Sequence, residues 1–297
     1  MANIELEQGR RATYEVIGRG ELALLFPGGP GAAASYMRRD AELFADAFTC
    51  YLIDPHGSGG STPPALPDDY SPEGHARFYN EVREALGLGR VTVLGHSFGG
   101  GVALTYSALF PEATSRCISA AGFAVGADVD SGESGEAAAE MEAMLSRHQS
   151  ADWYAEARAI WDEWTERVLT TDDASEVDAM MRVVMPLYTA HPERADVWQA
   201  IEDFRRDLHF DLAAVKAWEG GFYQNVDLRP LLPRISAPTL VIAGALDLIA
   251  GPAQARRIAE DTHNVDLVEI PECGHLLSVE EPAVYKASVT DWVARRT

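Results

Sequence analysis

Val91-Thr-Val-Leu-Gly95-His-Ser97-Phe-Gly99-Gly-Gly101 is the stretch that decides the fold. Its first four residues are apolar or β-branched and predict a buried strand, whereas apolar residues recur at helical spacing from Phe98 to Phe110. Ser97 therefore stands at a strand-to-helix turn, and its flanking glycines leave room where side chains would collide. Such a turn strains the serine backbone and exposes the hydroxyl above a sheet edge. We expect Ser97 to be a nucleophile, with the N-terminus of the helix available to stabilise an oxyanion.

Length and composition bound the kind of protein. A chain of 297 residues, 47% of them hydrophobic, fits one large α/β domain with an insertion. No stretch reaches the roughly 18 uninterrupted apolar residues of a membrane span. The acidic start, Met1 to Gln8, holds no apolar segment of a secretory signal, so we expect a cytoplasmic protein. Cys50, Cys117 and Cys273 lack metal-type spacing and lie in apolar surroundings, which favours reduced packing residues.

The formal net charge of −22 limits the partners. Nucleic acids and anionic membranes both need basic patches, so the charge argues against either as a partner. We expect a small-molecule substrate. The sequence leaves the oligomeric state open, a homo-oligomer included.

Strand patterns dominate the first half of the chain. Residues 3–8 and 12–17 alternate polar and apolar side chains, which is typical of an edge hairpin. Apolar runs at 21–26 and 48–53 predict central strands, and each run ends in a glycine-rich loop where ligands bind in open α/β sheets. Ser71-Pro72-Glu73 is typical of a helix start, and the helix is expected to end near Leu86. A further strand is expected at 116–121.

The pattern changes after about residue 124. Residues 126–139 are small, polar and acidic, which predicts a flexible link, and only helical patterns follow. Three apolar stripes at helical spacing mark these helices. They comprise Trp153, Ala157, Ile160, Trp161, Trp164 and Val168; Val177, Met180, Met181, Val184, Met185 and Tyr188; and Val197, Trp198, Ile201, Phe204 and Leu208. Residues 127–226 hold 22 Asp and Glu against 8 Lys and Arg, so most of the negative charge lies here.

These aromatic and methionine stripes predict helix packing first and a substrate cavity second, because packing accounts for most such residues. Trp153, Met185 and Tyr188 are candidates for substrate contact. Gly28 and His96, beside the glycine-rich loop and the nucleophile, are two more.

Strand and helix patterns return in the last third of the chain. Residues 238–247 and 265–270 predict strands, and helices are expected at 252–260 and 282–294. Alternating strands and helices with short connections imply a mostly parallel sheet covered on both faces.

Two residues near the C-terminus complete a reactive group. A serine hydroxyl is a poor nucleophile until a base takes its proton, and the base needs an orienting acid. Asp247 follows one buried strand and His275 follows the next, so both are expected at the sheet edge that carries Ser97. His275 would act as base and Asp247 would orient it. Asp227 is an alternative acid, and His56 and His96 are expected to be structural or to line the pocket.

The chain order Ser97, Asp247, His275 resembles the α/β-hydrolase superfamily on both sides of the insertion, and the loops are most similar to its proline iminopeptidase branch, peptidase family S33. That branch has an HGGPG loop, a DxRGxGxS loop and a GxSxGG elbow. The counterparts here are Pro27-Gly-Gly-Pro-Gly31, Asp54-Pro-His-Gly-Ser-Gly-Gly-Ser61 and Gly95-His-Ser-Phe-Gly-Gly100. Proline replaces the first histidine of the oxyanion loop, and His96 and Phe98 replace the glycine and tryptophan that usually flank the serine.

The resemblance implies an α/β-hydrolase fold, with a core at 1–124 and 228–297 and a helical cap at 125–227. It also implies that the backbone N–H groups of Gly29 and Phe98 form the oxyanion hole. Peptidases of that branch hold the free amine of the substrate with cap carboxylates, for which Glu202, Asp203 and Glu219 are examples here.

The leading hypothesis is a serine hydrolase that cleaves an ester, lactone or amide through an acyl-enzyme, with the substrate under a helical cap. An iminopeptidase-type amidase and a carboxylesterase or lactonase both stay open, with C–C bond hydrolase and thioesterase activities behind them. A non-catalytic ligand-binding member of the fold is the alternative of another class. No metal, nucleotide or flavin motif is visible, so we expect no cofactor and no metal site.

Overall fold

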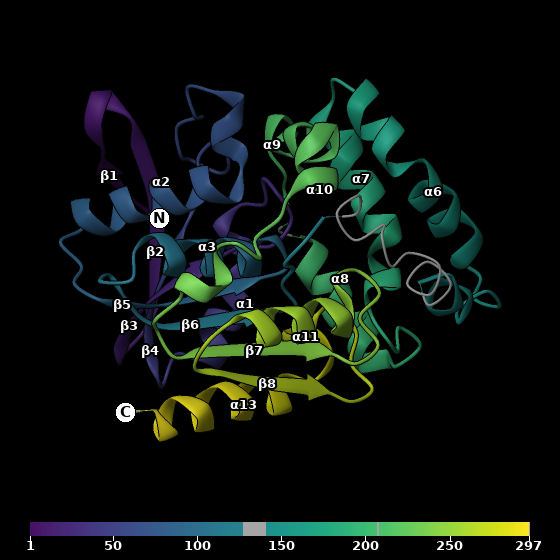
Figure 1. Ribbon diagram of the computed structural model, residues 1–297. Helices are drawn as coiled ribbons and strands as arrows, with labels where there is room; N and C mark the ends of the chain where they lie inside the picture. Colours follow the sequence, from purple (N-terminus) through teal and green to yellow (C-terminus); the bar gives the residue numbers. More distant parts are fainter. Residues whose placement is uncertain (127–140, 207, 297) are drawn as a thin grey trace.

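An eight-stranded sheet forms the centre of the computed structural model, which describes residues 1–126, 141–206 and 208–296 (Figure 1). The strand order is β1-β2-β4-β3-β5-β6-β7-β8. The strands are β1 (Ala2–Glu5), β2 (Arg11–Gly18), β3 (Glu21–Phe26), β4 (Phe48–Ile53), β5 (Val91–His96), β6 (Thr114–Ala120), β7 (Thr239–Gly244) and β8 (Val265–Ile270).

All pairings from β4 to β8 are parallel, whereas β1 and β2 form an antiparallel hairpin that pairs antiparallel with β4. The parallel register aligns the carboxyl ends of the strands. Leu94 of β5, for example, lies beside Leu25 of β3 and Ile118 of β6. Loops that follow these strands therefore meet at one edge, where open α/β sheets bind ligands.

Helices cover both faces of the sheet. Those of the sheet region are η1 (Glu7–Gly9), η2 (Ala34–Met37), α1 (Arg38–Leu43), η3 (Pro67–Tyr70), α2 (Pro72–Ala85), α3 (Phe98–Leu109), η7 (Leu232–Arg234), α11 (Gly251–Asp261), α12 (Leu277–Glu280) and α13 (Pro282–Arg295). The predicted cap of α2 is present, because the Ser71 hydroxyl accepts a hydrogen bond from the N–H of Gly74.

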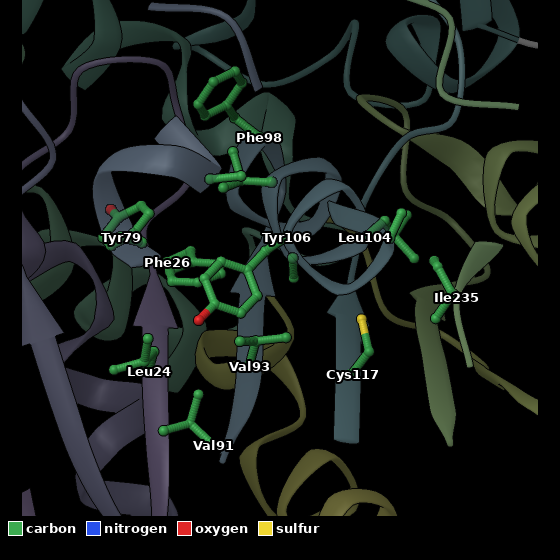
Figure 2. Close-up of a cluster of buried hydrophobic side chains, with 14 of the residues drawn as sticks. Leu24, Phe26, Tyr79, Val91, Val93, Phe98, Leu104, Tyr106, Cys117 and Ile235 are labelled. Atoms are coloured by element: carbon green, nitrogen blue, oxygen red, sulfur yellow. The ribbon is translucent and has the colours of Figure 1, made fainter. Parts of the chain in front are cut away.

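Two apolar clusters fasten these helices to the sheet. The first joins α2, α3 and α11 to one face, and within it the rings of Phe26 and Tyr79 stack with centroids 4.2 Å apart (Figure 2). The second joins α1 and α13 to the other face through side chains such as Phe44 and Trp292. Every residue of β5 is buried, as expected of a strand covered on both sides.

Between β6 and η7 the described residues form helices joined by loops, with isolated β-bridges at Val125 and Phe210. The helices include α6 (Tyr154–Thr170), α7 (Ala174–Val184), η5 (Met185–Tyr188), α8 (Ala195–Arg206), α9 (Leu212–Ala217), the π-helical turn η6 (Trp218–Phe222) and α10 (Tyr223–Asn225). We call the segment at 125–227 the insertion. Figure 1 shows its helices beyond the ends to which the arrows of β7 and β8 point.

The predicted α/β-hydrolase architecture is confirmed, and several elements match closely. Strands β3, β4 and β8 have the predicted bounds. The elements η2, α1 and α12 were not predicted, because they are short and carry no long periodic pattern. The predicted flexible link at 126–139 falls almost wholly outside the described residues. Cys50, Cys117 and Cys273 are buried and free.

Candidate active site

Ser97 occupies the sharp turn between β5 and α3. Its backbone has φ 56° and ψ −121°, a region that residues with a side chain rarely adopt. The turn is closely packed, since a Cβ atom on Gly95 would overlap the carbonyl oxygen of Gly99, and one on Gly99 would overlap that of Phe26. The Ser97 N–H donates to the Ala120 carbonyl at 2.9 Å, which ties the turn to β6.

Asp247 and His275 form a buried pair at the ends of β7 and β8. The Asp247 Oδ2 atom lies 2.9 Å from Nδ1 of His275, and its Oδ1 atom accepts backbone N–H groups from Ile249 at 2.7 Å and Ala250 at 3.2 Å. Burial raises the pKa of Asp247, but the interactions with His275 and these two N–H groups outweigh it and hold the pKa below its ordinary value. The aspartate is therefore a carboxylate, and His275 donates to it from Nδ1.

The other nitrogen of His275 is available for a further interaction. Nε2 is buried and has no hydrogen-bond partner among the described residues. His275 and Ser97 line the same cavity, together with Asp247. The strand-end positions of the three residues thus bring a strained serine, an imidazole and a carboxylate to one cavity.

Gly29 and Phe98, the predicted oxyanion donors, also line this cavity. Gly29 lies in the loop after β3 with φ 54°, and Phe98 is the first residue of α3. The loop of Gly29 is braced by the next one, because the Ser58 hydroxyl donates to the Gly31 carbonyl at 2.7 Å. Asp54, at the end of β4, accepts the N–H of Ala34 at 2.9 Å and so holds the chain that follows the glycines.

The cavity has a volume of about 460 Å³ and is enclosed mainly by apolar side chains. Some residues of the apolar stripes of the insertion line this cavity, and others pack between the helices. From the insertion come Met141, Met144, Trp164, Val177, Met181, Met185, Tyr188, Phe204, Leu208, Phe210, Val215, Trp218, Glu219, Tyr223 and Val226. The loops of the sheet region add, among others, Pro30, Tyr36, Phe123, Leu248, Ile249, Gln254 and Leu276.

The five candidates for substrate contact divide into two groups. Met185 and Tyr188 line the cavity, whereas Gly28, His96 and Trp153 do not. A Cβ atom on Gly28 would meet the ring of Tyr36, so that ring covers the glycine. Trp153 borders a separate groove on the insertion.

His96 supports the backbone of His275 instead. Its Nε2 atom lies 2.8 Å from the His275 carbonyl oxygen and therefore donates, which leaves Nδ1 to accept from the Tyr36 hydroxyl at 2.7 Å. Burial lowers the pKa of His96 to about 3, so the ring is neutral. No sequence pattern identified Tyr36, because it belongs to the short η2 turn.

The acidic candidates are also separated. Glu219 is the one carboxylate of the described insertion residues that lines the cavity, and its two oxygens accept from Trp164 Nε1 at 3.0 Å and Thr165 Oγ1 at 2.7 Å. Burial raises its pKa. Glu202 and Asp203 pair with Arg205 and Arg206 on α8, away from the cavity. Asp227, the alternative acid, forms an ion pair with Arg229 and does not line the cavity, whereas Asp247 is the partner of His275.

A parallel sheet with a strained serine at one strand end and a histidine–aspartate pair at two others defines the class of α/β hydrolases. Residues 23–282 match the family model described as alpha/beta hydrolase fold. The chain therefore belongs to this family and is an α/β-hydrolase enzyme.

Individual relatives agree with the family. The chain is 26% identical to a proline iminopeptidase of Levilactobacillus brevis, over 95% of this chain and 92% of that protein, which confirms the resemblance drawn from the loops. It is 27% identical to a putative carbamate hydrolase RutD of Stutzerimonas stutzeri, over 95% and 97% of the two chains. An esterase of Thermogutta terrifontis is 23% identical over 99% and 98%, with a TM-score of 0.73. The enol-lactonase of Burkholderia xenovorans LB400 is 19% identical over 99% and 100%, with a TM-score of 0.75.

Within the described residues, no helix is both long enough and apolar enough to span a bilayer.

Proposed function

We propose that the protein is a serine hydrolase that cleaves an ester or lactone through an acyl-enzyme. The observation that carries the proposal is the His275–Asp247 pair, in which Nε2 of His275 has no partner among the described residues and His275 lines the same cavity as Ser97. Asp247 fixes the proton of His275 on Nδ1, which leaves Nε2 as the base.

The reaction follows from these positions. The Ser97 oxygen attacks the substrate carbonyl while His275 Nε2 takes the hydroxyl proton, and the N–H groups of Gly29 and Phe98 stabilise the oxyanion. His275 then gives the proton to the leaving group. Water, activated by the same Nε2 atom, hydrolyses the acyl-enzyme and returns Ser97 to its starting state.

The cavity lining favours an uncharged substrate. Aromatic and methionine side chains dominate it, which suits an apolar acyl or alcohol group. Both oxygens of Glu219 already accept hydrogen bonds, and burial raises the pKa of this carboxyl. These features disfavour the binding of a charged amine, and thus favour an ester or lactone over a peptide.

An aminopeptidase is the second candidate. Glu219 lines the cavity, and a relative of similar length is named a proline iminopeptidase. A substrate amine that displaced the Trp164 or Thr165 donor would find a carboxylate partner there. Under this alternative the bond cleaved is an amide next to a free N-terminal amine.

We further propose that the insertion, 125–227, is a cap over a core formed by 1–124 and 228–297. The cavity takes side chains from both parts, as a cap that covers the substrate requires. A small-molecule substrate and a cytoplasmic location remain part of the proposal.

Replacing Ser97 by Ala tests the nucleophile. We expect turnover of the best ester or amide substrate to fall at least about a thousand-fold, since only the oxyanion donors and binding would remain. The thermal unfolding midpoint should stay close to that of the wild type. Turnover near the wild-type rate by the purified, folded variant would contradict the assignment of Ser97.

A paired assay distinguishes the two substrate classes. We expect turnover of p-nitrophenyl butyrate and of a macrocyclic lactone, and little or none of proline p-nitroanilide. In Glu219→Gln the amide oxygen can still accept from Trp164 Nε1, and the NH₂ group can donate to the Thr165 hydroxyl oxygen. This variant should therefore change kcat/KM for the ester by less than about threefold. Glu202→Gln, outside the cavity, is the matched control. Cleavage of the anilide that requires a free amine and is lost in Glu219→Gln, but not in Glu202→Gln, would favour the aminopeptidase.

A further inference from the structure

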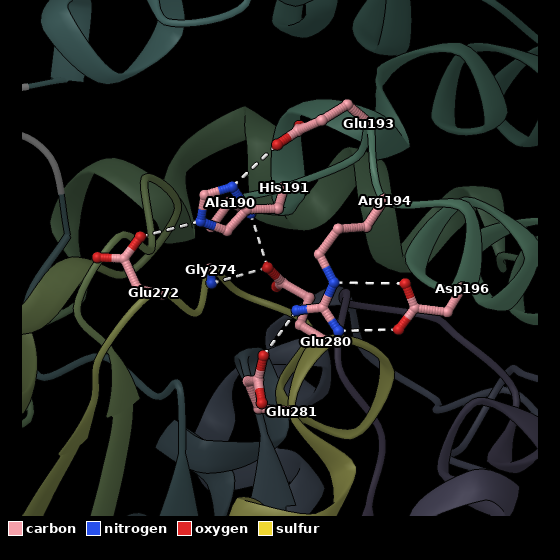
Figure 3. Close-up of polar contacts among 9 residues, drawn as sticks. All are labelled: Ala190, His191, Glu193, Arg194, Asp196, Glu272, Gly274, Glu280 and Glu281. Atoms are coloured by element: carbon pink, nitrogen blue, oxygen red, sulfur yellow. Dashed lines mark hydrogen bonds and ion pairs between the residues drawn. The ribbon is translucent and has the colours of Figure 1, made fainter.

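A buried carboxylate lies beside the loop of His275. Glu280 is the last residue of α12, and only 2% of its surface is exposed. Its Oε2 atom accepts the backbone N–H groups of Ala190 at 2.7 Å and Gly274 at 3.0 Å, and its Oε1 atom accepts that of Leu276 at 3.2 Å. Figure 3 shows the Glu280 side chain between the strand-end loop of Gly274 and the insertion segment of Ala190.

The three donors surround His275 on the chain. Gly274 and Leu276 are its two neighbours, so one carboxylate fixes the backbone on both sides of the imidazole. Ala190 belongs to the insertion, two residues after Tyr188, whose carbonyl accepts the N–H of His275 at 2.8 Å. The backbone of His275 is thus held to the insertion twice, once directly and once through Glu280.

Neutral side chains cannot replace this arrangement. Three N–H groups converge on two oxygens, and a carboxylate offers only acceptors, whereas an amide would turn an NH₂ group toward at least one donor. Burial raises the pKa of Glu280 to about 7, and the three N–H groups act in the opposite direction. The ionised form is the one in which all three donors are satisfied.

Surface contacts between the same two segments are weaker. His191 of the insertion lies 3.0 Å from Glu272, and Arg194 lies 2.7 Å from Glu281, all of them side chains with access to solvent (Figure 3). Exposed ion pairs of this kind contribute little because water and salt screen them. Glu280, in contrast, is a buried side chain that links the insertion to the His275 loop.

We propose that Glu280 is a positioning residue, which sets the place of His275 relative to Ser97 by tying the His275 loop to the insertion. The proposal rests on the function proposed for Ser97 and His275. A displaced imidazole would transfer the Ser97 proton less efficiently, while the cavity that binds the substrate would be unchanged. Loss of Glu280 should therefore lower kcat rather than raise KM.

Glu280→Gln tests this role, with Asp40→Asn as the matched control. Asp40 is also a buried carboxyl against α12, where its Oδ2 atom accepts from the Ser278 hydroxyl at 3.1 Å, but it contacts neither neighbour of His275. With the ester substrate that the wild type cleaves, we expect kcat to fall at least tenfold in Glu280→Gln, with KM changed by less than about threefold. The kcat of Asp40→Asn should stay within about twofold of the wild-type value, even if the thermal unfolding midpoints of Asp40→Asn and Glu280→Gln fall by the same amount.

A binding measurement separates positioning from damage to the cavity. In the Ser97→Ala background, adding Glu280→Gln should leave the Kd of the uncleaved ester within about twofold. A weakened Kd, or an equal loss of kcat in Asp40→Asn, would overturn the proposal in favour of a general structural role. An unchanged kcat in folded Glu280→Gln would also overturn it. If Glu280→Gln does not fold, Glu280→Asp, whose shorter carboxylate cannot reach all three donors, must show the same kcat loss. Ser97→Ala is measured in parallel to test the proposed function itself. If Ser97→Ala cleaves the ester at the wild-type rate, the proposed function is wrong, whatever Glu280→Gln shows.

Discussion

Ser97 combines a strained backbone with the position of an expected nucleophile. The Ser97 backbone, with positive φ and ψ near −120°, has a conformation that only glycine adopts without strain. Other residues adopt such conformations at a cost of about 1–3 kcal/mol. The surrounding backbone enforces the conformation, because β5 and α3 approach each other through glycines that leave no room for a Cβ atom. The strain is thus built into the turn and does not depend on the hydroxyl.

Comparing Ser97→Gly with Ser97→Ala measures this strain. Both variants lack the hydroxyl, but only glycine adopts the backbone conformation freely. After allowance for the flexibility of glycine in the unfolded chain, we expect the free energy of unfolding of Ser97→Gly to exceed that of Ser97→Ala by about 1 kcal/mol. Urea unfolding of the two proteins provides the measurement. An alanine variant as stable as the glycine variant would mean that the turn is not strained.

The sequence allowed part of the candidate site to be predicted at this scale. Ser97 and Asp247 follow the buried strands β5 and β7, His275 follows the edge strand β8, and parallel strands bring such positions to one cavity. Tyr36 and Glu280 were not predicted, because their contacts with His96 and with Ala190 join segments far apart in the chain. No local spacing reports a contact of that kind.

The helices and strands differed in how clearly hydrophobic periodicity in the sequence predicted them. The buried strands β3 and β4 have the predicted bounds, and the long helices α2 and α13 were predicted to within a residue. Strand β7 ends at Gly244, three residues before the predicted end at 247. The shorter α1 and α12, with six and four residues, are held by tertiary packing rather than by propensity, and they were missed. In the insertion, the apolar stripes in the sequence predicted the buried faces of α6, α7 and α8. They could not distinguish residues that pack between helices from residues that line the cavity. Phe204 faces the cavity, whereas Val197 on the same helix packs inside.

Across the whole molecule, buried ionisable groups couple stability to pH in opposite directions. Burial lowers the pKa of His56, His75 and His96 to about 2, 4 and 3, so each favours the folded state only while neutral. The contribution of these histidines to the free energy of unfolding therefore falls as the pH decreases below about 6.5, where the unfolded chain takes up these protons. Burial raises the pKa of Asp40 to about 6 and of Glu280 to about 7, so their protonation stabilises the fold over much of the same range.

His75→Asn isolates one of the histidine contributions. His75 is buried on α2, its ring centroid lies 4.5 Å from that of His56, and its Nδ1 atom lies 3.0 Å from the Ser71 carbonyl, to which an asparagine amide can donate in its place. A fall in pKa from 6.5 to about 4 corresponds to about 3 kcal/mol of stability lost between pH 7.5 and pH 4. Stability measured by urea unfolding over this range should decline less steeply in the variant than in the wild type. His263→Asn, at an exposed position, should follow the wild type. Parallel curves for His75→Asn and the wild type would show that His75 takes up its proton in the folded protein, which its packing against His56 and Phe98 opposes.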